Sequence, residues 1–172
     1  MSLGVRWRSP DTLFGYHLAD LTDFGPSALT LTNNAAVTFP VDGFGNACAN
    51  FLGTTNYLSN IVTVPSPSQN FTISCWVKFT TVAAATYGLF KWALSTGINY
   101  KFTRLTLTYS APNYILAVYP SSATPITYTI PSFALNKWYH IVITHANSGN
   151  VSLYLNGAIA GTPAAGGITS LL

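Results

Sequence analysis

The stretch of sequence that decides the fold class is Phe71-Thr72-Ile73-Ser74-Cys75-Trp76-Val77-Lys78-Phe79. Along a β-strand, successive side chains point to opposite faces, so a two-residue rhythm predicts a strand with one buried face. We therefore predict a half-buried strand here. Its buried face carries Phe71, Ile73, Cys75, Val77 and Phe79, and its other face carries Thr72, Ser74, Trp76 and Lys78.

Similar runs, rich in the Tyr, Thr, Val, Ile and Leu that suit a pleated sheet, recur along the chain. They lie at residues 29–31, 89–92, 104–109, 114–119, 126–130, 138–144 and 151–155. Between them the sequence has no stretch of helical periodicity of about ten residues or more. The chain is therefore predicted to be all-β.

Clusters of Gly, Pro, Asn and Asp separate these runs, among them Asn33-Asn34 and Asn156-Gly157. Strands of about five residues with turns at this spacing are typical of a two-sheet antiparallel sandwich. A type I′ hairpin turn needs positive φ at both central residues, which Asn tolerates and Gly adopts freely. We therefore expect residues 152–155 to fold back onto residues 158–160 across Asn156-Gly157.

The composition is that of one globular domain spanning residues 1–172. Only 6% of the residues are charged, 49% are hydrophobic and the formal net charge is +3. No apolar run approaches the ~20 residues of a membrane helix, and the basic residues are too sparse to follow a phosphate backbone. We expect neither membrane insertion nor a nucleic-acid partner, and the N-terminus shows no secretory signal.

The acidic residues limit the possible chemistry, because Glu is absent and the four Asp all lie within the first 42 residues. Glycoside hydrolysis needs two carboxyl groups that face one bond, and the strands after residue 42 provide none. His140 lies in a predicted strand, and the sequence has no GxSxG motif that would supply a nucleophilic serine. We therefore interpret His140 as a structural residue. The chain is predicted not to be an enzyme.

Calcium is the one metal that the sequence suits, through the carboxylates of Asp20, Asp23 and Asp42 in turn-rich segments. The alternative is that these carboxylates accept backbone N–H bonds within turns. Cys48 and Cys75 have no CxxC spacing and no paired histidines, so two free thiols are favoured over a disulfide or a metal site.

A candidate ligand-binding set combines rings with hydrogen-bonding groups and consists of Trp92, Arg104, Thr106 and Tyr119. Flat rings stack on the apolar faces of sugars, and Thr and Arg side chains bond to sugar hydroxyls. The alternative is that Tyr and Thr are the residues that any exposed antiparallel face uses.

Several motifs in order resemble the laminin-G-like domains of the concanavalin A-like lectin and glucanase superfamily. FTISCWVK at 71–78 is similar to the family's FTISFWVK strand, NKWYHIV at 136–142 to its GKWHHVAV strand, and VSLYLNG at 151–157 to its LYLNG hairpin. The opening half contributes GYHL at 15–18, DFG at 23–25, GFGNA at 43–47, FLG at 51–53 and YL at 57–58. The resemblance covers about residues 14 to 160.

This resemblance implies a concanavalin A-like jelly-roll sandwich that recognises a glycan or a surface protein, outside the cell or on a particle surface. The catalytic branch of the family carries two Glu around an Asp, which this sequence lacks. The family's closing strand also has no counterpart in the final residues, 166–172. An unpaired sheet edge would pair with another chain, so we expect a homo-oligomer or a fragment of a longer product.

The sequence leaves two classes of function open. The first is a non-catalytic module that binds carbohydrate or mediates adhesion. The second is a structural protein of a virion, fibre or surface layer, in which the jelly roll is a building block and the low charge reflects burial between subunits.

Overall fold

The computed structural model describes residues 21–22, 30–41, 45, 47–51, 55–59, 70–81, 86–93, 102–110, 113–119, 125–130, 133–146 and 150–163. The chain divides into two compact units, residues 1–63 and 64–172. Every regular element in the described part is a β-strand and all strand pairs are antiparallel, so the predicted all-β class is confirmed. The described residues form no helix long and apolar enough to cross a membrane.

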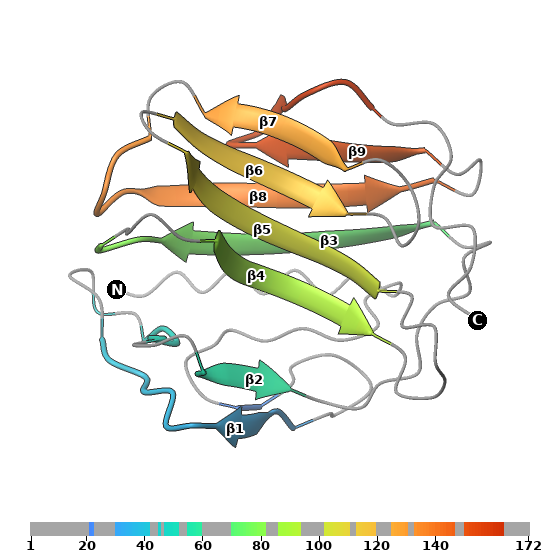
Figure 1. Ribbon diagram of the computed structural model, residues 1–172. Helices are drawn as coiled ribbons and strands as arrows, with labels where there is room; N and C mark the ends of the chain where they lie inside the picture. The colour runs from blue at the N-terminus through green and yellow to red at the C-terminus, as the bar shows by residue number, and fades with distance from the viewer. Residues whose placement is uncertain are drawn as a thin grey trace. The chain divides into compact units, whose positions relative to one another are not determined.

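The second unit is a sandwich of two four-stranded sheets, with strand orders β10-β9-β8-β3 and β4-β5-β6-β7. In Figure 1 the β4–β7 sheet lies in front of β3, β8 and β9, and the strands of the two layers cross obliquely. The strands are β3 (Phe71–Lys78), β4 (Thr86–Ala93), β5 (Phe102–Ser110), β6 (Asn113–Tyr119), β7 (Ile126–Ile130), β8 (Trp138–His145), β9 (Val151–Leu155) and β10 (Ala158–Ile159).

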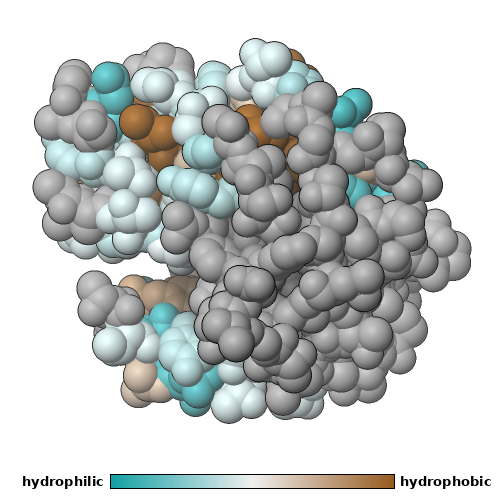
Figure 2. Space-filling view, turned by 45° about the vertical axis from the view of Figure 1, so that its right-hand side comes forward, coloured by the Kyte–Doolittle hydropathy of each residue, from teal (hydrophilic) through white to brown (hydrophobic). Residues whose placement is uncertain are grey.

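The core lies between the two sheets and is built from alternate residues of each strand. Burial of a Leu or Ile side chain contributes about 1.5–3 kcal/mol, so this layer is the main source of stability. Figure 2 shows hydrophobic residues in patches between paler ones on the surface in view. The most buried core residues are Leu105, Leu107, Leu116 and Val118 of the β4–β7 sheet and Ile143, Val151 and Leu153 of the other.

A β-bulge interrupts the pairing of β4 with β5 between Gly88 and Phe90. A bulge inserts one extra residue into a strand and so reverses the alternation beyond it. As a result, Leu89 and Phe90 both pack against the core.

The hairpin predicted at Asn156-Gly157 is confirmed. Both residues have positive φ, 51° and 83°, and Leu155 pairs with Ala158 on either side of them. Beyond β10, Gly161 has φ +80° and passes so close to β7 that an added Cβ would lie 3.0 Å from the Thr127 carbonyl oxygen. Gly161 thus brings the end of the described chain against the opposite sheet.

The first unit contains β1 (Thr32–Asn34) paired with β2 (Tyr57–Ser59). The predicted turn at Asn33-Asn34 is wrong, because both residues lie in β1 and the positive φ angles follow at Ala35 and Ala36. The physical reason is the Asn33 amide, which donates to the Val37 carbonyl (2.8 Å) and accepts from the Val37 N–H (2.9 Å). Asn33 therefore closes the turn from a position within the strand.

Candidate functional site

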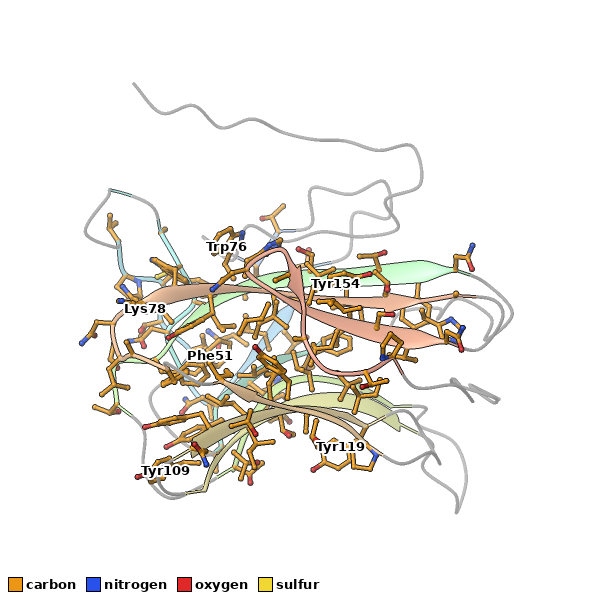
Figure 3. The ribbon with its side chains drawn as sticks, turned by 90° about the horizontal axis from the view of Figure 1, so that it is seen from above. Phe51, Trp76, Lys78, Tyr109, Tyr119 and Tyr154 are labelled. Atoms are coloured by element: carbon orange, nitrogen blue, oxygen red, sulfur yellow. The ribbon has the colours of Figure 1, made fainter. Side chains whose placement is uncertain are left out.

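The sandwich of the second unit has two outward faces, one on each sheet. Figure 3 views the sandwich from above and shows Tyr119 projecting from one layer while Trp76 and Tyr154 project from the other. Apart from Thr106 and Ala117, which are only 5% and 2% exposed, the side chains on these faces lie outside the core between the sheets. They are therefore the candidates for binding.

The outward face of the β4–β7 sheet is dominated by threonines, and we name it the threonine face. Its members are Thr86, Thr106, Thr108, Thr127 and Thr129. Two rows run across the sheet: one joins Gly88, Thr106, Ala117 and Thr127, and the other joins Thr86, Thr108, Ile115 and Thr129.

Burial differs between the centre and the borders of the threonine face. Thr106 is only 5% exposed, and its hydroxyl has no hydrogen-bond partner in the described part of the chain. Thr127 and Thr129, on β7, are exposed. Exposed threonines therefore lie at both borders of the face, Thr86 on β4 and Thr127 and Thr129 on β7.

The structure brings three of the four predicted ligand-binding residues to this face. Arg104 pairs with Tyr119 across β5 and β6, and Thr106 follows Arg104 by two residues, so their register positions share one side. Trp92 pairs with Thr103, in the same alternating set as Leu105 of the core. The bulge in β4 therefore separates the position of Trp92 from the other three.

The predicted calcium ligands Asp20, Asp23 and Asp42 lie outside the described residues, and the calcium site stays a prediction. Among the residues that the structure describes, no three His, Cys, Asp or Glu side chains gather into a metal site.

The outward face of the other sheet carries large rings, and the candidate set named from the sequence does not include them. We name it the tryptophan face, and Trp76 on β3 is its most exposed ring, at 62%. One side of Trp76 stacks on His140 of β8, with ring centres 4.7 Å apart and 17° between the planes. The members of this face are Ser74, Trp76, Lys78, Trp138, His140 and Tyr154.

His140 is held from two directions. Its Nε2 forms a 2.8 Å hydrogen bond with the Ser74 hydroxyl. Its backbone N–H donates to the Asn156 side-chain oxygen (2.9 Å), while the Asn156 N–H donates to the His140 carbonyl (2.8 Å). The hairpin turn therefore fixes the strand position of the residue on which Trp76 stacks.

The hydrogen bond between the Ser74 hydroxyl and His140 Nε2 has the length expected between a nucleophile and its general base. A third group that orients the base is missing from this sheet, because no Asp or Glu occurs after residue 42. The imidazole is instead packed flat on Trp76. The Ser74 hydroxyl and the Trp76 ring hold the imidazole in place, and the interpretation of His140 as structural stays a prediction.

Both cysteines are free thiols, as the sequence favours. Burial in the second unit raises the pKa of Cys75 from 9.0 to about 11, because desolvation disfavours the thiolate. Cys75 is therefore protonated at neutral pH and behaves as a small apolar residue of the core.

Comparison with known families agrees with this architecture. The Laminin_G_3 family model, described as the concanavalin A-like lectin/glucanases superfamily, matches residues 52–170. The chain belongs to this superfamily. The match spans the sandwich, so the resemblance carried by the motifs at 71–78, 136–142 and 151–157 is confirmed, whereas the opening motifs at 15–18, 23–25 and 43–47 lie outside the matched residues.

Two solved structures resemble this superfamily member. The binding domain of Paraclostridial Mosquitocidal Protein 1 aligns with a TM-score of 0.58 and 17% identity over 89% of this chain and 39% of that one. The Botulinum Neurotoxin serotype G binding domain aligns with a TM-score of 0.58 and 19% identity over 84% of this chain and 36% of that one. At these identities the likeness is one of fold, and the chain spans less than two fifths of either structure. No curated protein matches the chain.

Proposed function

We propose that this protein is a non-catalytic carbohydrate-binding module of the concanavalin A-like superfamily. The observation that supports the proposal is the shared side of Arg104, Thr106 and Tyr119 on the threonine face, beside the exposed hydroxyls of Thr127 and Thr129. Hydroxyl and guanidinium groups hydrogen-bond to sugar hydroxyls, and a tyrosine ring packs on the apolar side of a sugar.

The positions of the acidic residues in the sequence support a binding role without catalysis. The strands of the sandwich carry no Asp or Glu, so they offer no pair of carboxyl groups to cleave a glycosidic bond. Both of the similar solved structures are themselves binding domains.

The proposal is tested by screening the full chain on a neutral glycan array, with and without calcium. We expect saturable binding that falls about tenfold in Tyr119→Ala, which removes a stacking ring, and in the double variant Thr127→Val/Thr129→Val, which removes two hydroxyls that bond to the sugar. Tyr57→Ala is the matched control, since Tyr57 is 55% exposed and lies in the first unit.

Three results would contradict the proposal: no glycan bound, binding unchanged in both variants, or cleavage of the bound glycan detected by mass spectrometry. Concentration-dependent oligomers without any glycan binding would instead favour the structural role. A loss of binding on removal of calcium would support the prediction for Asp20, Asp23 and Asp42.

A further inference from the structure

The tryptophan face holds a positive charge for which the second unit has no acidic partner. Lys78 lies on β3 opposite Trp138, and its Nζ is 5.0 Å from the centre of that ring. No Asp or Glu occurs anywhere in residues 64–172. An ammonium group held at a ring, with no carboxylate on its own unit, favours an anionic ligand.

A flat apolar ring lies beside this charge. Trp76 precedes Lys78 by two residues on the same strand, so both side chains leave the same face from Cα atoms about 7 Å apart. The indole is fixed on one side by His140 and 62% exposed overall. Figure 3 shows Trp76 directed away from the opposite sheet. The face thus combines a stacking surface and a cation at a set spacing.

Tyr154 lies on the same face but two strands from Trp76, beyond His140 of β8. It lies on β9, pairs with Val142 of β8, and projects from the same layer as Trp76 in Figure 3. Trp76 and Lys78, which lie on one strand, therefore form the core of the site, and Tyr154 lies outside it.

We propose that the tryptophan face binds a sugar ring that carries a carboxylate. Trp76 stacks on the apolar side of the sugar, and Lys78 pairs with the carboxylate. This site is separate from the threonine face, because the two faces lie on opposite sides of the sandwich. It therefore does not depend on the proposed function of that face.

The test uses the full chain on an array of uronic-acid oligosaccharides, each printed beside its carboxyl methyl ester. We expect acids to bind more strongly than their esters. Trp76→Ala should weaken binding of the acids about 30-fold, because it removes the ring that stacks on the sugar and tryptophan is a common hot-spot residue. Lys78→Gln should weaken binding of the acids about fivefold, the effect of one solvent-exposed ion pair, and leave binding of the esters unchanged.

Three variants serve as controls. Trp76→Phe keeps a stacking ring and should retain most of the binding, which separates loss of the ring from loss of the fold. Lys137→Gln removes an exposed lysine just before β8 and should have little effect. Tyr119→Ala, on the opposite face, should leave binding of the acids unchanged.

The proposal is overturned if no acid binds, if acids and esters bind equally, or if Lys137→Gln matches the loss in Lys78→Gln. Loss of acid binding in Tyr119→Ala together with normal binding in Trp76→Ala would also overturn it, while leaving the proposed function of the threonine face intact.

Discussion

On the β4–β7 sheet most outward positions carry threonines, with Arg104 and Tyr119 as a neighbouring pair, whereas the outward face of the opposite sheet is set apart by its large rings and Lys78. Their inward positions are alike, because both sheets contribute fully buried aliphatic residues to one core. The contrast teaches that the two-residue rhythm sets the core on both sheets, while the outward chemistry of each sheet varies independently. The following experiments test each half of that statement.

The largest expected effect concerns the likeness of the inward faces. Leu105 on β5 and Leu153 on β9 are equally buried, at 0% and 1% exposure. We expect Leu105→Ala and Leu153→Ala each to lower the free energy of unfolding by about 3 kcal/mol or more, since each leaves a cavity. Urea denaturation measures both. A marked difference between them would show that the sheets do not share the core evenly.

The next effect concerns the place where the end of the chain approaches the opposite sheet. Gly161→Ala should destabilise the protein by about 2 to 3 kcal/mol, because it adds a close contact with the Thr127 carbonyl to the cost of positive φ. Gly157→Ala is the matched control, since its φ is similar but its Cβ would meet nothing within 4 Å. We expect it to cost only about 1 kcal/mol in thermal or urea unfolding. Equal costs would contradict the close approach.

A third experiment examines the inward face of β3 through pH. The pKa of Cys75 is raised to about 11, so the folded state keeps a proton that the unfolded chain loses from about pH 9 upward. The contribution of this thiol to the free energy of unfolding is therefore fully present below pH 9 and declines as the pH rises toward 11. By pH 10.5 the loss should be about 2 kcal/mol relative to Cys75→Ala, measured by urea unfolding at pH 8 and pH 10.5. Parallel pH profiles for the two proteins would show that the thiol is not desolvated.

The smallest expected effect comes from comparing two threonines of the outward face, one with an unpartnered hydroxyl in the described part of the chain and one with a hydrogen-bonded hydroxyl. Thr106→Val should stabilise the fold by about 1 kcal/mol, because it removes a buried hydroxyl without a partner in the described part of the chain. Thr108→Val should instead be slightly destabilising, since the Thr108 hydroxyl is hydrogen-bonded to that of Thr86 at 3.0 Å. Chemical denaturation would compare the two. A destabilised Thr106→Val would mean that its hydroxyl is paired.

The sequence predicts the inward faces well, because alternation is a local property of each strand. The hairpin at Asn156-Gly157 is equally local, since it depends on two residues that tolerate positive φ. The bulge near Gly88 has no comparable local signal, and it reverses the alternation that would otherwise place Trp92 beside Arg104. One extra residue thus separates a predicted set that periodicity alone would keep together.

The tryptophan face depends on register between strands that lie far apart in the sequence. Trp76 meets His140 only because β3 pairs with β8 in one alignment, which neither strand specifies alone. A signal was nevertheless present: Trp76 occupies the polar side of its own alternation, and a large ring in that position predicts an exposed tryptophan.

Asn156 has a consequence that reaches beyond the hairpin. Its backbone reverses the chain, while its side-chain oxygen accepts from the His140 N–H. Glycine also adopts positive φ, so Asn156→Gly would preserve the reversal and delete only the amide contact. The fixed stacking of Trp76 on His140 can in this way be weakened without unfolding the protein. In Asn156→Gly the Trp76 side chain would become more dynamic, while the melting curve stayed nearly the same.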